Sequence, residues 1–270
     1  MHLLHVWWDE AGDGPTNMAV DEMLAAEALR RDALLVRIYG WEPTTISLGA
    51  FQKLDDAAAI AEIHGVPLVR RPSGGGAIVH GSDLTYAAAV PKTHPWGASP
   101  QVLYDALHAA MAVALIEQGV EASLWRPPDG PTQSSASAAG DGSFFCFDRR
   151  ASGDLVVPDH GAGDGGRGHK IMGSAQRRLA GAVLQHGSLL IRRNGTLTGR
   201  ACHPGVSDLS VSRPAANLET QPLLERWLQL VAQTLGANVL SQTGDFRGLQ
   251  ARNLDDHAAR FRDAGWIGRR

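Results

Sequence analysis

Apolar and polar residues alternate along the chain with two periodicities, one typical of helices and one typical of strands. Strong helix formers fill Thr16–Arg31, which starts at a capping hydroxyl and ends in two arginines, and they predict a helix. Apolar side chains recur at helical spacing farther along. Further helices are therefore predicted at 55–65, 100–118, 221–235 and 246–264.

Shorter apolar runs between these helices predict strands. They lie at 34–41, 45–51, 66–73, 76–91, 121–125 and 169–178. Helices and strands alternate irregularly and show no repeat, which favours an α+β fold, a mixed β-sheet with flanking helices, over a regular doubly wound sheet. No break in the pattern marks a boundary, so we predict a single domain over residues 1–270.

Two segments interrupt this pattern with residues that have little to bury. Residues 127–143 are rich in Pro, Ser, Gly and Ala, and residues 158–168 are rich in Gly. Such compositions do not support a packed core, so we predict flexible surface loops at both places.

Composition and charge exclude several classes of protein. A formal net charge of −3 over 270 residues argues against a general nucleic-acid binder. No apolar run approaches the ~20 residues that span a bilayer, and the N-terminus lacks the pattern of a signal peptide. We therefore expect a cytoplasmic protein whose two cysteines are free thiols. The 11 histidines are scattered without ligand spacing, so no metal site is predicted.

The stretch RRPSGGGAIVH, which begins at Arg70, places three adjacent glycines directly after two arginines. Glycine runs serve tight turns, or let a ligand lie against bare backbone. A plain strand-to-strand turn with solvated arginines is the alternative. On the ligand-binding interpretation, cationic side chains beside open backbone hold a polar head group. The candidate binding residues are Arg70, Arg71, Ser73, Gly74, Gly75, Gly76 and His80.

Lys170 and Cys146 are the candidate catalytic residues. Lys170 stands beside an apolar pair in a predicted strand, so we expect burial to lower its pKa and make it a proton acceptor or hydrogen-bond donor. A strand-edge lysine that reaches solvent is the alternative. Cys146 lies among phenylalanines, as a small buried hydrophobe would, but Arg149 and Arg150 follow it and cations stabilise a thiolate. A thiolate with a lysine in reach is the minimum apparatus for acyl transfer through a thioester.

The two glycine-rich basic stretches together resemble a known family. VRRPSGGGAIVHGSDLTY and HKIMGSAQRR, followed by LQHGSLLI, are similar to segments of the lipoate–protein ligase, octanoyltransferase and biotin–protein ligase superfamily. The likeness covers residues 17–191. It implies a biotin/lipoate protein ligase-like catalytic domain in which the Arg/Gly stretch lines an acyl pocket. Lys170 then corresponds to the lysine of the family's motif. It adds four substrate-binding candidates, Gly173, Ser174, Gln176 and His186.

Within this superfamily the chain is most similar to the cysteine-dependent octanoyltransferases. Cys146 and Phe147 stand eight residues before Asp154 and Leu155, as in those enzymes, and Gly153 replaces the asparagine of the ligase motif. The resemblance implies that an octanoyl group passes from acyl carrier protein to the cysteine, and then to a lysine of a lipoyl domain. The acceptor would belong to a 2-oxoacid dehydrogenase or be the glycine cleavage H protein. This reaction requires no cofactor, nucleic acid or membrane.

In this mechanism Lys170 polarises the thioester carbonyl. Backbone N–H groups near Gly74–Ala77 or Gly173–Ser174 serve as oxyanion donors. Two other functions stay open at this point. An ATP-dependent lipoate–protein ligase would form a lipoyl-adenylate with ATP and Mg²⁺, and a binding module would keep the pocket without turnover. Cys202, in a turn-like segment, is assigned no role.

Overall fold

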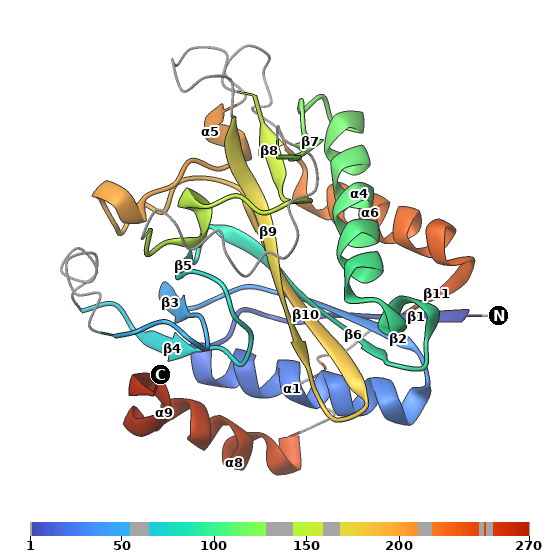
Figure 1. Ribbon diagram of the computed structural model, residues 1–270, viewed down its shortest axis with the longest axis horizontal. Coiled ribbons are helices and arrows are strands. Elements are labelled where there is room, and N and C mark those ends of the chain that lie inside the picture. The colour runs from blue at the N-terminus through green and yellow to red at the C-terminus, as the bar shows by residue number, and fades with distance from the viewer. Residues whose placement is uncertain are drawn as a thin grey trace.

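The computed structural model of the chain describes residues 2–54, 65–127, 143–158, 168–209, 218–242, 246 and 251–269. A large mixed sheet forms the centre, with helices on both faces and a small second sheet beside it (Figure 1). This arrangement confirms the predicted α+β fold. The predicted helix at 55–65 and nearly all of the two predicted loops lie outside the described residues.

The large sheet has eight described strands, in the order β11-β1-β2-β6-β10-β9-β8-β7. They are β1 (His2–Trp8), β2 (Leu34–Tyr39), β6 (Asp83–Pro91), β7 (Ser123–Leu124), β8 (Leu155–Val157), β9 (His169–Arg178), β10 (Ala182–Leu190) and β11 (Ala237–Gln242). β11, β1 and β2 run parallel, and every pairing from β2 to β7 is antiparallel. The predicted strands do not include β1, β8, β10 or β11.

The small sheet consists of β4 (Leu68–Arg70), β3 (Thr45–Leu48) and β5 (Ile78–His80), in that spatial order. The single strand predicted over 76–91 is wrong, because a bend at Gly81 and Ser82 divides it into β5 and β6. Gly81 has a φ of +120°, a backbone conformation that L side chains rarely adopt. The bend lets the chain pass from the small sheet to the large one.

The described helices confirm the predictions near 16–31, 100–118 and 221–235, and a helix also lies within 246–264. They are α1 (Gly14–Arg31), α3 (Pro95–Ala98), α4 (Pro100–Glu117), α5 (Val206–Leu209), α6 (Thr220–Leu235), α8 (Ala251–Arg262) and α9 (Ala264–Gly268). The prediction of Thr16 as the cap of the first helix is wrong. The Asp13 carboxylate caps α1 by accepting the Thr16 N–H at 2.8 Å, so the cap lies three residues earlier than expected.

Two hydrophobic cores attach the helices to the large sheet. On one face, α4 and α6 pack through residues such as Leu107 and Trp227. On the other face, α1 and α8 pack through residues such as Met18 and Phe261 (Figure 1). Among the described residues, no helix is both long and apolar enough to cross a bilayer.

Candidate active site

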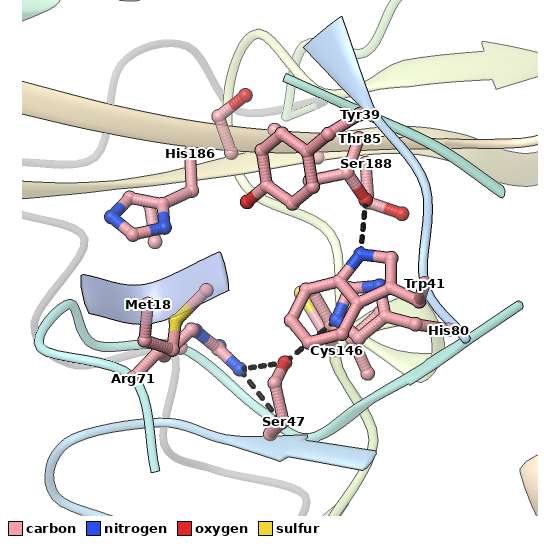
Figure 2. Close-up of a pocket in the computed structure, with 16 residues that line it drawn as sticks. Met18, Tyr39, Trp41, Ser47, Arg71, His80, Thr85, Cys146, His186 and Ser188 are labelled. Atoms are coloured by element: carbon pink, nitrogen blue, oxygen red, sulfur yellow. Dashed lines mark hydrogen bonds between the residues drawn. The ribbon is translucent and has the colours of Figure 1, made fainter. Parts of the chain in front are cut away.

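A pocket with about 440 Å³ of empty space, partly open to solvent, lies on the α1 face of the large sheet (Figure 2). Glycines, aromatic rings and a few convergent polar groups form its wall, as in small-molecule sites. The lining residues are Met18, Tyr39, Trp41, Ser47, Arg71, Gly75, Ile78, His80, Thr85, Cys146, Gly173, Ser174, Ala175, His186, Gly187 and Ser188. They come from α1, from both sheets and from three connecting segments, so only the folded chain has this pocket.

The glycine run brings its backbone against the cysteine segment. A Cβ on Gly76 would stand 2.7 Å from the Cys146 nitrogen, and Gly75 has a φ of +94°. The buried guanidinium of Arg71 holds the run by donating to the carbonyl oxygens of Gly74 and Gly76 at 2.8 and 2.7 Å. Burial lowers the pKa of Arg71 to about 10, which leaves it charged at neutral pH.

The structure brings the two predicted catalytic residues, Cys146 and Lys170, into contact. The Sγ atom of Cys146 lies 3.6 Å from the Nζ atom of Lys170. The Cys146 N–H donates to the Ala77 carbonyl oxygen at 2.8 Å, and the Ala77 N–H donates to the Phe144 carbonyl oxygen at 2.9 Å. These backbone bonds fix the thiol at the pocket wall, next to the glycine run.

A bulge in β9 aims Lys170 at the thiol. Opposite β8, Ile171 is an extra residue on β9. Ile171 and Met172 both belong to the buried core on the α4 face, which leaves Lys170 beside Gly173. A Cβ on Gly173 would lie 2.5 Å from the Lys170 Cε atom, so this glycine makes room for the lysine side chain.

Asp154 anchors the ammonium group of Lys170. Its Oδ2 atom lies 2.8 Å from Nζ, and its other carboxylate oxygen accepts the Tyr104 hydroxyl at 2.7 Å. Burial opposes the charge on Lys170, but Cys146 and Asp154 outweigh that effect and raise the pKa of Lys170. The expectation that burial lowers this pKa is therefore wrong. Lys170 is an ammonium group at neutral pH, suited to donating hydrogen bonds and not to accepting a proton.

His80 and Trp41 form a flat aromatic wall of the pocket (Figure 2). Their rings stack with centroids 3.9 Å apart. His80 Nδ1 lies 2.8 Å from Asp83 Oδ2, and its Nε2 lies 2.8 Å from Ser47 Oγ. The indole N–H of Trp41 donates to the Thr85 hydroxyl oxygen at 2.8 Å. These bonds satisfy the buried polar atoms and fix the orientation of both rings.

Ser174 connects the pocket to the α4 face of the sheet. Its Oγ atom lies 2.6 Å from His108 Nε2 and 2.8 Å from the Tyr86 hydroxyl oxygen. The Nδ1 atom of His108 lies 2.7 Å from the Gly153 carbonyl oxygen. Burial lowers the pKa of His108 to about 4, so its ring is neutral at neutral pH.

The remaining predicted residues divide into two groups. His186 lines the pocket and lies 3.2 Å from Asp21 through its Nδ1 atom, while its Nε2 atom bonds to none of the described residues. Six predicted residues do not line the pocket: Lys170, which contacts Cys146 at its edge, and Arg70, Ser73, Gly74, Gly76 and Gln176. Arg70 is fully buried and donates to three backbone carbonyl oxygens at 2.6 to 2.8 Å, which ties β4 to neighbouring segments.

Sequence reasoning overlooked several residues of the site. Tyr104 and His108 lie one turn apart on α4, and their rings stack with centroids 4.0 Å apart. Their helical spacing of four was a possible signal, because it places both on one side of the helix. Met18, Tyr39, Trp41 and Ser47 carried no comparable signal. Cys202 does not line the pocket, and its thiol bonds to the Asn194 carbonyl oxygen at 3.5 Å.

Comparison with known proteins identifies relatives of this chain. A model of the lipoyl protein ligase A/B catalytic domain matches residues 13–220. An octanoyltransferase LipM of Moorella thermoacetica is 36% identical over 190 residues, which cover 68% of this chain and 63% of that protein. The LipM of Geobacillus kaustophilus is 35% identical over 182 residues, covering 65% and 60%. These matches thus span less than two thirds of the relatives' length.

Solved structures share the fold at lower identity. A bipartite lipoate protein ligase of Thermoplasma acidophilum, described with its E2 lipoyl domain, aligns with a TM-score of 0.65 and 18% identity. The alignment covers 99% of this chain and 96% of that one. At this identity the likeness is evidence for the fold alone, and it agrees with the biotin/lipoate ligase-like architecture expected from the sequence.

Proposed function

This chain belongs to the lipoyl protein ligase A/B catalytic domain family, and from that premise we propose that it is an acyltransferase that moves an octanoyl group from acyl carrier protein to a lipoyl domain. The acceptor is the lysine of a lipoyl domain, in a 2-oxoacid dehydrogenase or in the glycine cleavage H protein. The observation that supports this most strongly is the cysteine–lysine pair at the pocket, with Sγ 3.6 Å from Nζ. The names of the LipM relatives agree with it.

The proposed reaction has two steps. In the first, the Cys146 thiolate attacks the carbonyl carbon of the octanoyl thioester, a new C–S bond forms, and the carrier thiol leaves and takes up a proton. In the second, the neutral ε-amine of the acceptor lysine attacks the enzyme thioester. The amide forms, the amine nitrogen loses a proton, and the Cys146 thiolate is regenerated. A covalent intermediate divides one difficult transfer into two easier ones.

Each step places negative charge on the carbonyl oxygen, which the site can stabilise. Lys170 supplies a fixed ammonium group beside Sγ, held by Asp154. Of the expected backbone donors, the Ala77 N–H is already bonded to a carbonyl oxygen. The carbonyl of Gly74 faces Arg71, so the N–H of the same peptide unit, on Gly75, points the opposite way. Gly75 lines the pocket, so its N–H is the oxyanion donor we propose in the glycine run, with the N–H groups of Gly173 and Ser174 on β9 as the alternatives.

Mass spectrometry tests the covalent step. Octanoyl-carrier protein alone should add one octanoyl mass to the wild-type protein, in a bond that hydroxylamine cleaves. Cys146→Ser should lose this adduct and the transfer, because the serine hydroxyl is not ionised at neutral pH. Cys202→Ser is the matched control and should transfer at the wild-type rate, since its thiol lies outside the pocket.

The same assay distinguishes the competing functions. Transfer from free acid that requires ATP, with normal activity in Cys146→Ser, would show a ligase and disprove the thioester mechanism. Binding of the acylated carrier without any transfer would indicate a module without turnover.

A further inference from the structure

A groove next to the pocket collects arginine side chains. It is open to solvent and spans about 1310 Å³ between α1, the end of β9 and the two C-terminal helices. Its cationic lining residues are Arg30, Arg177, Arg260 and Arg269, with His257 beside them. Its two acids are Glu22 and Glu27.

The acids of this arginine groove are already neutralised. Glu22 pairs with Arg260, and Glu27 pairs with Arg30. Among the residues that the structure describes, neither Arg177 nor Arg269 forms an ion pair. Burial lowers the pKa of Arg269, and the positive charges of Arg260 and Arg177 lower it further. The negative charge of Glu22 opposes this effect, but the groove still holds four arginines against two acids, and a bound anion would relieve the repulsion between the arginines.

Two elements lead from the pocket to the groove in the same direction. On β9, Gly173 and Ala175 line the pocket, and Arg177 follows on the same side of the strand because side chains alternate. On α1, Met18 lines the pocket and Glu22 lines the groove one turn later. The groove thus continues the side of the sheet that carries the pocket.

The distance from the pocket to the groove matches the length of the arm that carries the acyl group. From Gly173, beside Lys170, to Arg177 the strand advances four residues, or about 13 Å. A 4′-phosphopantetheine arm has thirteen bonds between its thioester sulfur and its phosphorus. An extended chain advances about 3.4 Å for every three bonds, so this arm reaches roughly 15 Å. With the thioester at Cys146, the phosphate falls within reach of the Arg177 guanidinium.

We propose that the arginine groove binds the phosphodiester of the carrier's 4′-phosphopantetheine arm, with Arg177 as its principal contact. This proposal rests on the proposed function, because it concerns the donor of the same reaction. A guanidinium donates two hydrogen bonds to a phosphate in a fixed geometry, which makes arginine well suited to this role. The groove would select phosphorylated donors over neutral thioesters of the same acyl group.

Two small donors test the proposal without the carrier protein. Octanoyl-4′-phosphopantetheine and octanoyl-pantetheine differ only in the phosphate. We expect the wild type to acylate Cys146 with a KM about tenfold lower for the phosphorylated donor. Arg177→Ala should remove this preference by raising only the KM for the phosphorylated donor. Arg178→Ala, which removes the same charge from the adjacent exposed residue outside the groove, should leave it intact.

Equal KM values for the two donors in the wild type, or a preference that survives Arg177→Ala, would overturn the proposal. An Arg177 effect seen only with whole carrier protein would also overturn it, since the groove would then contact the protein surface. Titration calorimetry with 4′-phosphopantetheine and pantetheine gives a readout independent of transfer. Binding that requires the phosphate and Arg177, in a protein that transfers nothing, would retain the anion site and reject the proposed function.

Discussion

At the scale of single residues, Lys170 decides how Cys146 reacts. Lys170→Ala removes the cation that stabilises the thiolate and the oxyanion, while the pocket wall remains. Loss of one such electrostatic contact costs about 10²–10³-fold in rate, or ~3–4 kcal/mol. We expect acylation to slow by that factor with little change in carrier binding, and alkylation of Cys146 at neutral pH to slow as well.

Lys170→Arg tests whether charge alone suffices. The lysine side chain packs so closely against Gly173 that a single added Cβ there would collide with it. A larger, planar guanidinium therefore does not fit between Asp154 and Sγ. We expect no rescue of acylation. Lys92→Ala, at an exposed position, is the matched control and should behave as wild type. Near-normal acylation by Lys170→Ala would show that Cys146 works without this lysine.

At the scale of elements, the turn between β4 and β5 brings two distant segments into contact. A methyl group at Gly76 would press on the Cys146 backbone at 2.7 to 2.9 Å, where neither side is a flexible side-chain end. Gly76→Ala should therefore displace the cysteine, slow its acylation at least about tenfold and lower the melting temperature. Acylation rate and thermal unfolding measure the two effects.

Gly74→Ala is the control in the same turn. Its methyl group would meet only the Phe51 ring at 3.8 Å, an ordinary contact, and no positive φ stands in its way. Stability should stay the same or rise by about 0.4–1 kcal/mol, because alanine restricts the unfolded chain. Equal damage by both substitutions would mean that the turn tolerates no side chain at all, and would remove the special role of Gly76.

At the scale of the whole molecule, His108 links the stability of the fold to pH. The pKa of this ring is about 4 in the folded protein, because of burial, against 6.5 when exposed. The unfolded chain thus binds more protons between these values, and stability falls as the pH drops through that window. The loss from this group amounts to roughly 3 kcal/mol once the pH is below both pKa values.

Urea unfolding at pH 7.5, 5.5 and 4.5 measures this dependence. His108→Asn keeps a donor for the Gly153 carbonyl oxygen but does not titrate, so its stability should fall less steeply over the same range. Other groups titrate here too, and the difference between the two slopes isolates His108. Parallel slopes for the variant and the wild type would show that this ring does not drive the acid response.

Elements and residues whose signal is local could be predicted from the sequence. The helices near 16–31, 100–118 and 221–235 follow from helical spacing and flanking residues. The chemical pair Cys146 and Lys170 follows from residue type and motif, and the structure places the two side chains in contact. Such signals survive in a single sequence because each depends on neighbours a few positions away.

Tertiary structure alone decided what depends on distant partners. β1 is a strand because it pairs with β2 and β11, which lie far from it in the chain. The pKa of Lys170 rises because folding brings Cys146 and Asp154 to its buried ammonium group, a balance that residue type does not reveal. Arg70 and Arg71 are adjacent in sequence, yet only Arg71 lines the pocket, because Arg70 ends β4 and Arg71 begins the turn that holds the glycine run.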